Sequence, residues 1–427
     1  MRFGRASLLA GSLAVPVLVA GALVAQTGAA AASTSAARHH GHVLFVSKHA
    51  HKGAADRSCR SAAHKTISGA LKAAPPWSTV VVCPGSYHEQ VVATKPVSLR
   101  GKHAVINQKG VTPSYVADVP GIGKLPIFAG VVIVSSHVSL RGFVVKNALG
   151  EGVLAAGVNG TIHGVVIRHN AVVHNDLGGG VPPASDYFEC QPSGPIPGDC
   201  GEGVHFIAVA HSAVFGNFIA RNSGGVLLTD ETGPTHDNVI ANNTVTRNVD
   251  DCGITVPGHN PNALSASGQR QPKVAGVYRN LIVHNVVTHN GTTGEGAGVL
   301  FANATAGTAS YDNVVLGNYI AGNGLSGVTM HAHTLAPGQF EDLNGNKVIG
   351  NRIGTNNLAG DGLDGSVSDM KTTGVLVFSG GTPVHVVIAH NRIFDNKIGI
   401  WLSAPVHAAG LHTNHFHHVK TPISAGN

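Results

Sequence analysis

The chain of 427 residues is rich in glycine (56 residues), poor in charged residues (12%) and poor in aromatic residues (5%). This composition is unusual for a helical globule and is typical of short strands joined by tight turns. The formal net charge of +6 is not gathered into a Lys/Arg cluster, so the sequence offers no patch for nucleic acid.

The N-terminus has the features of a secretory signal peptide. Arg2 and Arg5 form the positive region, Leu8–Val24 the apolar region and Ala29–Ala32 the small-residue cleavage site. We expect cleavage rather than a retained transmembrane anchor, and no other stretch is long and apolar enough to span a bilayer. The mature protein is therefore expected to be secreted, either extracellular or associated with the cell wall.

The remaining chain is expected to form one domain. The predicted divisions are a signal peptide over residues 1–32, a Ser/Ala/His-rich linker over 33–57, the folded domain over 58–420 and a tail over 421–427.

Five cysteines fit an oxidising compartment. Cys59 and Cys83 bracket the first folded segment, and Cys190 and Cys200 lie in a Pro/Gly-rich loop. Each pair is a candidate disulfide. Cys252 is left over, so either one thiol is free or the pairing differs.

A short helix is predicted at His64–Ala74, where Ile67 and Leu71 share one face and Pro75 and Pro76 stop the helix. Such a helix in front of many strands would cap the open end of a stack. The short strands predicted after it are Thr79–Cys83, Val97–Leu99, Val105–Ile106, Val131–Val134, Val138–Leu140 and Phe143–Val145.

From Val165 onward an asparagine repeat organises the chain. Asparagine recurs every fifth residue, with a β-branched residue between, and a Gly-led apolar strand follows each copy. The complete copies are Asn238, Asn243 and Asn248; Asn280, Asn285 and Asn290; Asn313, Asn318 and Asn323; and Asn346, Asn351 and Asn356.

Equivalent asparagines are separated by variable steps, which indicates rungs of roughly twenty-five residues with loops inserted at particular corners. Asparagine tolerates the left-handed bend conformation, and its side chain can bond neighbouring backbone. Stacked rungs would form amide ladders at a corner and an aliphatic stack inside. The predicted fold is therefore all-β, a parallel β-helix (solenoid) with a short N-terminal capping helix. We expect the helix to be right-handed, because connections between parallel strands are generally right-handed.

The chain resembles the pectate-lyase-like right-handed parallel β-helix proteins that carry generic parallel β-helix repeats. The resemblance lies in VSLRGFVVKNA (Val138–Ala148), GVVIRHNAVVHN (Gly164–Asn175), NVIANNTVTRN (Asn238–Asn248) and HNRIFDNKIGIWL (His390–Leu402). It covers about Thr66 to Val419. The fold hosts lyases, hydrolases, epimerases, adhesins and accessory proteins, so the resemblance implies the fold and leaves the activity open.

Insertions fall on both sides of the Gly-led strand and would wall a groove along it. They are Asp176–Glu202, Gly291–Ala297 and Asn357–Thr373 before the strand, and Thr229–Asp237, Pro257–Arg279, Ala302–Asp312 and His331–Gly345 after it. In the family, long polymers lie in a comparable groove, so the resemblance implies an extracellular polysaccharide as partner.

Acidic residues gather beside this groove. The catalytic candidates are Asp250, Asp251 and Glu295 before the strands, with Asp230 and His259 after them. Two nearby carboxylates can serve as acid and base or nucleophile in sugar hydrolysis. They can also hold calcium, which would acidify a uronate substrate. The alternative is turn chemistry, because Asp and Glu are common at strand ends.

The segment NVDDCGITV (Asn248–Val256) resembles the Asp-Asp-Cys segment of polygalacturonases, with Asp250 and Asp251 matching the paired aspartates. The departures are large. The preceding rung has Asn222–Gly225 where that family carries another Asp, and the next has Gly296–Gly298 where it carries Gly-His-Gly.

Further polar and aromatic residues near the groove are candidates for substrate binding, with Trp401 as a sugar platform. They are Glu202, His205, Asn303, His331, His333 and Trp401.

Two metal readings remain open. Three aspartates in a Gly-rich loop are weak calcium candidates whose spacing does not match an EF-hand: Asp361, Asp364 and Asp369. The 27 histidines favour a second reading, because imidazole binds copper and zinc. Some repeat proteins of this type resemble the copper-handling accessory protein for nitrous-oxide reductase.

The leading functional expectation is a monomer that binds an extracellular, acidic polysaccharide and, if catalytic, cleaves or epimerises it. The alternatives are a metal (copper) accessory protein and a non-catalytic surface or adhesion solenoid.

Overall fold

The computed structural model describes residues 41–119, 123–176, 202–292, 296–303, 305–332, 336, 338–359 and 372–425. The chain divides into residues 1–40 and 41–427, and all described residues belong to the second unit. The expected signal peptide and the Cys190/Cys200 pair therefore lie outside the described residues. No helix in the described part of the chain has the length and apolarity that a bilayer crossing requires.

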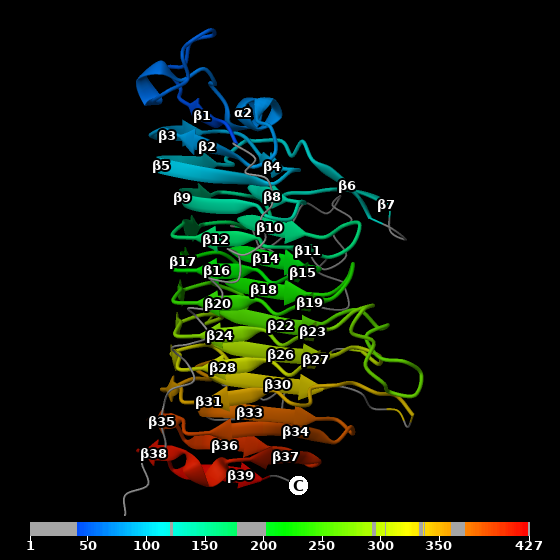
Figure 1. Cartoon of the computed structure of the whole chain (residues 1–427). Helices are drawn as coiled ribbons and strands as arrows, with labels where there is room; N and C mark the ends of the chain where they lie inside the picture. The colour runs from blue at the N-terminus through cyan, green and yellow to red at the C-terminus, as the bar shows by residue number, and fades with distance from the viewer. Residues whose placement is uncertain are drawn as a thin grey trace, which may run out of the picture. The chain divides into compact units, whose positions relative to one another are not determined.

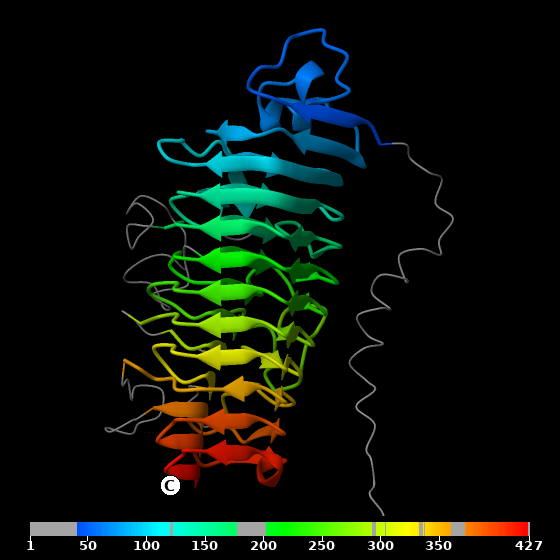
Figure 2. The same ribbon diagram turned by 90° about the vertical axis from the view of Figure 1, so that its left-hand side faces the viewer.

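Parallel strands stack rung upon rung into three sheets (Figures 1 and 2). Sheet B has 11 strands: β4 (Val91–Ala93), β8 (Val131–Ile133), β10 (Val153–Ala156), β14 (Val204–Ile207), β18 (Val226–Thr229), β22 (Ile254–Gly258), β26 (Val299–Asn303), β30 (Val328–Ala332), β33 (Thr373–Ser379), β36 (Ile398–Leu402) and β39 (Thr421–Ala425). Sheet D has five: β11 (Ile162–His163), β15 (Val209–Ala210), β19 (Thr235–His236), β23 (Val277–Tyr278) and β27 (Ser310–Tyr311).

Sheet A has 21 strands within the described residues and contributes two short strands to most rungs. Its members are β1 (Val43–Val46), β2 (Ser78–Val82), β3 (Gly85–Tyr87), β5 (Val97–Asn107), β9 (Ser139–Lys146), β12 (Val166–Arg168), β13 (Ala171–Val173), β16 (Ala213–Phe215), β17 (Phe218–Ala220), β20 (Val239–Ala241), β21 (Thr244–Thr246), β24 (Leu281–Val283), β25 (Val286–Thr288), β28 (Val314–Leu316), β29 (Tyr319–Ala321), β31 (Lys347–Ile349), β32 (Arg352–Ile353), β34 (Val384–Ala389), β35 (Arg392–Phe394), β37 (Val406–Ala409) and β38 (His415–His417).

The remaining elements lie outside these sheets. β6 (Val116–Val119) and β7 (Gly123–Pro126) form an antiparallel hairpin. Among the described residues, the helical elements are α2 (Ile67–Ala73) and the 3₁₀ turns η1 (Cys59–Ser61) and η3 (Leu411–Thr413).

A typical rung runs through sheets B, D and A in turn, as in β14, β15, β16 and β17, and each strand pairs in parallel with its equivalent one rung on. This confirms the predicted right-handed parallel β-helix. The inward side chains are Val, Ile, Leu and Phe that form one continuous core.

Two local predictions need correction. The stretches around residues 97–106 and 138–145 were each expected to be two strands, but β5 and β9 each run unbroken past an internal glycine. Strand β1 lies inside the expected linker 33–57 and pairs with β2, so the folded unit begins earlier than predicted. The sequence VLFV at Val43–Val46 carries the alternating burial of a strand at the sheet's end.

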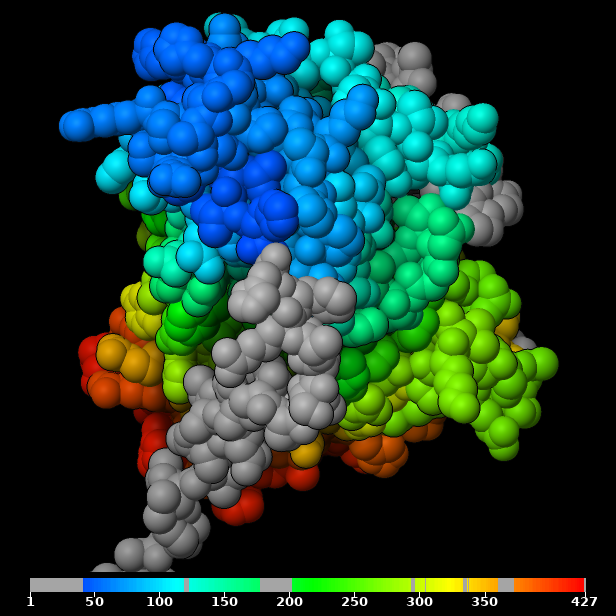
Figure 3. Space-filling model, turned by 45° about the horizontal axis from the view of Figure 1, so that its top comes forward, coloured from blue at the N-terminus to red at the C-terminus, as the bar shows by residue number. Residues whose placement is uncertain are grey.

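The N-terminal cap is as predicted, with α2 placed over the first rungs (Figure 1), and N-terminal residues cover this end of the molecule (Figure 3). The side chain of Thr66 caps it by accepting from the Gly69 backbone N–H at 3.1 Å. A disulfide joins Cys59 to Cys83, which confirms that pairing, and Cys252 is a buried free thiol.

The repeat asparagines form three amide ladders. In each, the side-chain Oδ1 of one asparagine accepts both the backbone N–H and the Nδ2–H of its equivalent on the preceding rung, as Asn285 does from Asn243 at 2.9 and 3.0 Å. The ladders are Asn238, Asn280, Asn313 and Asn346; Asn170, Asn217, Asn243, Asn285, Asn318, Asn351, Asn391 and Asn414; and Asn175, Asn222, Asn248, Asn290, Asn323, Asn356 and Asn396.

The left-handed bend does not fall on the ladder asparagines. The residue before the asparagine adopts positive φ instead, for example His284 (φ 55°) before Asn285 and Arg247 (φ 56°) before Asn248. The ladder asparagine is needed for its amide, which replaces the backbone partners lost at the corner.

Candidate functional site

Sheet B carries a row of outward positions, because alternate residues of a strand point to opposite faces. The second residue of each strand stands in register with its neighbours: His205 with Leu227, Leu227 with Thr255, and Leu300 with Thr329. We call the edge where these strands begin the entry side and the edge where they end the exit side.

Glu151, Glu202 and His205 form an acid–histidine cluster on this face. Their ligand-type atoms all lie within 4.8 Å of one another, and the three side chains are 0–2% exposed. His205 Nδ1 lies 3.4 Å from Glu151 Oε1. On the next rung Gly224 leaves room for Glu202, since a Cβ there would lie 2.9 Å from Glu202 Oε1.

A line of contacts runs from this cluster to the exit side. His205 Nε2 lies 2.9 Å from Thr229 Oγ1, and Thr229 donates to Glu231 Oε2 at 2.5 Å. The other Glu231 oxygen, Oε1, lies 2.5 Å from His259 Nδ1. We call Glu151, His205, Thr229, Glu231 and His259 the polar line.

Hydrogen-bond chemistry orders the protons along the polar line. An ionised Glu231 only accepts, so the Thr229 hydroxyl gives it its single hydrogen. Thr229 Oγ1 must then accept from His205 Nε2–H. Nδ1 of His205 therefore faces Glu151 either with a second hydrogen, as imidazolium, or with a lone pair.

Asp230 is fully buried beside the polar line, where its carboxylate organises the backbone. Oδ1 accepts from the backbone N–H groups of His259 (2.7 Å) and Asn260 (3.1 Å), and Oδ2 accepts from that of Gly276 (2.6 Å). Burial, with the nearby Glu231 charge, raises the pKa of Asp230 to about 7. Asp230 thus fixes the loop that carries His259.

The predicted catalytic residues separate into two groups. Asp250 and Asp251 lie on the entry side, where Asp251 Oδ1 accepts from the Cys252 backbone N–H at 2.5 Å. His259 lies at the far end of the five-residue strand β22, which at about 3.3 Å per residue keeps it well away from Asp251. Asp230 does meet His259, but the side-chain partner of His259 is Glu231.

The expected binding residues also differ in their surroundings. Asn303 is completely buried at the exit side, and neither of its amide atoms has a hydrogen-bond partner among the described residues. A Cβ at Gly258, the neighbour of His259, would lie 2.7 Å from Asn303 Oδ1. His331 is half-buried at the end of the outward row. Trp401 is 5% exposed and packs with Leu376, so it is not an open sugar platform.

Several predicted residues lie outside the described residues. They are Glu295, His333, Asp361, Asp364 and Asp369.

Sequence reasoning missed Glu151 and Thr229 and did not choose Glu231 as a candidate. A signal for Glu151 was present, since the tripeptide Glu-Gly-Val occurs at both Glu151 and Glu202 directly before strands that pair with each other. Thr229 offers no such signal, because a threonine at a strand end is ordinary.

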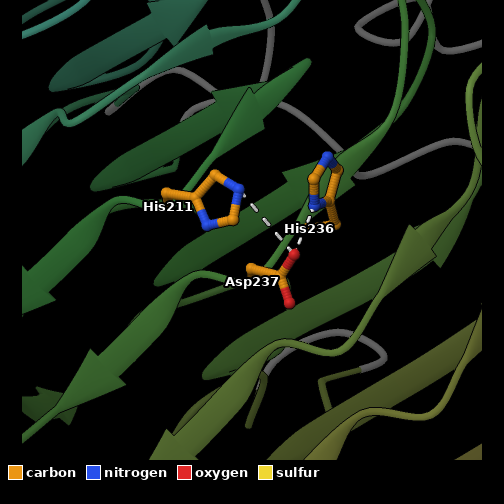
Figure 4. Close-up of side chains that lie close together, drawn as sticks. All are labelled: His211, His236 and Asp237. Atoms are coloured by element: carbon orange, nitrogen blue, oxygen red, sulfur yellow. Dashed lines mark hydrogen bonds and ion pairs between the residues drawn. The ribbon is translucent and has the colours of Figure 1, made fainter. Parts of the chain in front are cut away.

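A second cluster lies at a surface corner, formed by His211, His236 and Asp237 (Figure 4). His236 Nδ1 is 2.7 Å and His211 Nε2 4.0 Å from Asp237 Oδ2. Arg279 donates to both Asp237 oxygens, at 2.9 and 2.7 Å. Burial opposes ionisation, but Arg279 and His236 lower the pKa of Asp237 to about 2.

The sheet topology and the amide ladders define a parallel β-helix of stacked, loop-bearing rungs. The family described as "Protein of unknown function (DUF1565)" matches residues 52–269, and the chain belongs to this family. No curated protein matches the chain.

Solved structures with a similar fold include three carbohydrate-active proteins. An alginate lyase from Paenibacillus sp. str. FPU-7 shares 12% identity over 90% of this chain and 99% of its own, with a TM-score of 0.46. The GH136 lacto-N-biosidase from Eubacterium ramulus shares 12% over 90% and 68%, with a TM-score of 0.48. The mannuronan C-5 epimerase AlgE4 A-module from Azotobacter vinelandii shares 15% over 84% and 94%, with a TM-score of 0.43.

Proposed function

We propose that this protein binds an extracellular polysaccharide along the exit side of sheet B and exchanges a proton with a bound sugar at His259. The observation that carries the proposal is the polar line, which runs from the buried Glu151 to His259, whose side chain is 5% exposed. A carboxylate bonded to one imidazole nitrogen orients the ring for acid–base chemistry. In His259 the Glu231 carboxylate contacts Nδ1, and Nε2 is buried.

The exit side has features that suit a ligand. Asn303 presents a buried amide without a partner among the described residues, and buried amides in proteins are normally satisfied by a bound group or water. A cavity of about 570 Å³ lies further along the exit side, beside β8 and β10, and is lined by Tyr115, Val116, Asp118, Val134, Val158, Asn159, Gly160, Thr161 and Ile162.

The length of this surface favours a polymer over a single sugar. Four rung steps separate β8 from β22, and at about 4.8 Å per rung they span roughly 19 Å. A surface that repeats from rung to rung matches a ligand that is itself a linear repeat. The formal net charge of +6 favours an acidic polymer.

Proton transfer at His259 supports either sugar elimination, in which a base removes the proton beside a uronate carboxyl, or epimerisation at the same carbon. The test is a panel of polyuronates and neutral polysaccharides, assayed for unsaturated ends, reducing ends and exchange of the ring proton with solvent deuterium. We expect activity on a polyuronate and a loss of at least about 100-fold in His259→Gln, the range of a general acid–base group.

Glu231→Gln should lower the rate and shift its pH profile, because the imidazole loses its ionised partner. His415→Gln, on the exposed strand β38, is the matched control and should match the wild type. A blank panel with no polymer retained in affinity electrophoresis would contradict the proposal. Full activity in His259→Gln would refute the assignment of His259.

A further inference from the structure

We infer that Glu151, Glu202 and His205 form a binding site for one divalent first-row transition-metal ion, for which Zn²⁺ is the natural probe. This inference is independent of the proposed sugar chemistry, because metal affinity is measured without any polysaccharide. Glu151 lies just before β10 and Glu202 just before β14, on consecutive rungs, and His205 is the second residue of β14.

The donor set matches such an ion. Imidazole favours zinc, copper and nickel over calcium and magnesium, and two carboxylates complete a set with open positions. Ligand atoms of one zinc ion are at most about 4.2 Å apart, twice a zinc–ligand distance. His205 Nδ1 and Glu151 Oε1, 3.4 Å apart, already meet this limit. The ligand atoms of the whole set lie within 4.8 Å of one another, slightly above this limit.

The second nitrogen of His205 has the support that metal-bound histidines usually show. Such a histidine donates its other N–H to a fixed acceptor, which holds the ring and selects the tautomer. Here Nε2 donates to Thr229 Oγ1, and Thr229 donates to Glu231. The lone pair of the neutral ring is then on Nδ1, the nitrogen that faces Glu151.

The next rung leaves space beside the cluster. Gly224 adds room, because any side chain at this position would approach Glu202.

The surface cluster of His211, His236 and Asp237 differs from the buried cluster in its electrostatic surroundings. It also offers three ligand atoms, but Arg279 binds both oxygens of Asp237 and places a fixed positive charge there. That charge would repel a cation. Glu151 and His205 contact no lysine or arginine side chain in the part of the chain that the structure describes.

The experiment is a Zn²⁺ titration of chelator-treated protein in competition with a chromophoric chelator, comparing wild type with variants. Other histidines contribute equally to all samples, so the difference between wild type and Glu151→Gln isolates this site. We expect one fewer tight site in Glu151→Gln, and binding about 10- to 100-fold weaker in Thr229→Val, which keeps all three ligands and removes the hydroxyl that supports His205. Ca²⁺ should not compete. Asp237→Asn is the control and should bind as the wild type does.

A second measurement does not depend on how the variants fold. Anomalous scattering at the zinc edge from a crystal of the wild-type protein should place a peak between Glu151 and His205. The inference is overturned if that position has no peak, or if folded Glu151→Gln binds as many ions as tightly as the wild type. A wild type that takes up no Zn²⁺ at neutral pH would also overturn it.

Discussion

Asp230 and Asp237 belong to the same rung, and their surroundings shift their pKa values in opposite directions. Asp230 is enclosed next to another carboxylate, so its ionised form is disfavoured. Asp237 is only partly enclosed and is held by Arg279, so its ionised form is favoured. The two residues therefore give the protein opposite responses to pH.

For Asp237 we expect acid sensitivity. Its folded pKa of about 2 lies below the unfolded value of 3.8, so its stabilising contribution is present above about pH 4 and is lost as the pH falls towards 2. With partial exposure discounted, this contribution is about 1–2 kcal/mol. Acid unfolding of Asp237→Asn should start from a lower stability and depend less on pH. Asp118→Asn, at an exposed position, is the control, and identical acid curves for wild type and Asp237→Asn would exclude the effect.

For Asp230 the sign is reversed. Its folded pKa of about 7 lies above the unfolded value of 3.8, so its contribution is fully present below about pH 4 and is lost as the pH rises through 7. In Asp230→Asn the free energy of unfolding should therefore fall less between these pH values. Chemical denaturation at a series of pH values measures this slope, and an unchanged slope would show that Asp230 ionises normally.

Individual site residues were only partly predictable. His259 and Asp230 were expected together and do meet, because the register of consecutive strands places their strand ends side by side. Asp251 was expected to join them, but it precedes its strand whereas His259 follows it. The sequence does not show that Glu231 turns towards His259, because this depends on side-chain directions within a loop.

At the level of the elements, histidine rings lie over glycines at the corners. The ring of His284 occupies the space where a Cβ at Gly317 would stand, and the same holds for His289 over Gly322 and His169 over Gly216. Both residues of each pair have positive φ. The histidine ring of one rung thus fills the space that a side chain at the glycine of the next rung would occupy.

Gly317 and Gly350 form a matched pair for testing this arrangement. Their φ values are 64° and 65°, but a Cβ at Gly317 would lie 2.7 Å from the His284 ring, whereas at Gly350 the nearest atom is 3.9 Å away. Gly350→Ala should cost about 1 kcal/mol, the cost of the left-handed conformation. Gly317→Ala should cost about 1 kcal/mol more, because the new Cβ would collide with the His284 ring and force it to shift. His284→Ala should remove the excess, and equal costs in both backgrounds would contradict the ring contact.

The amide ladders predict a large loss for a single substitution. Asn285 accepts two hydrogen bonds from Asn243 and donates to Ile240 O and Asn318. Asn285→Ala would leave buried donors of Asn243 without an acceptor and should cost about 3 kcal/mol. Chemical denaturation gives the value. Asn262→Ala, at an exposed position, should change stability by less than about 0.5 kcal/mol, and a similarly small change at Asn285 would mean that water replaces the ladder.

The strands and corners were more predictable than the site, because the amide ladders require asparagines that recur visibly every fifth residue in the sequence. From Asn170 onward the rungs supply an asparagine at the same corner, and most sheet B strands have a glycine at or directly before their start. A Cβ at Gly253 would come within 2.3 Å of Val287 Cγ1. The boundaries in the first rungs, where the repeat has not begun, were the ones predicted wrongly.

On the scale of the whole molecule, the two ends of the stack differ. The N-terminal end is closed by α2 and by the Cys59–Cys83 disulfide, whereas β39 at the other end is largely exposed. An exposed edge strand can pair with another chain. Pro422 within β39 and Lys420 directly before it oppose such pairing.

The disulfide should contribute to global stability. Its sequence separation of 24 residues corresponds to about 3 kcal/mol in the chain-entropy treatment. The Cys59→Ala/Cys83→Ala double variant should unfold at lower denaturant concentration, with amide exchange accelerating first in α2 and β1. Cys252→Ala is the comparison, and no shift in the double variant would mean that the cap holds without the bond.

The longest amide ladder links asparagines that are 47, 26, 42, 33, 33, 40 and 23 residues apart in the chain, without a break. The ladder therefore depends on the order of the rungs and is independent of the number of residues between them. Lengthening or exchanging a loop between two corners leaves the position of every corner unchanged. New recognition loops can consequently be grafted onto one edge of this protein as independent modules, each anchored by the same few amides.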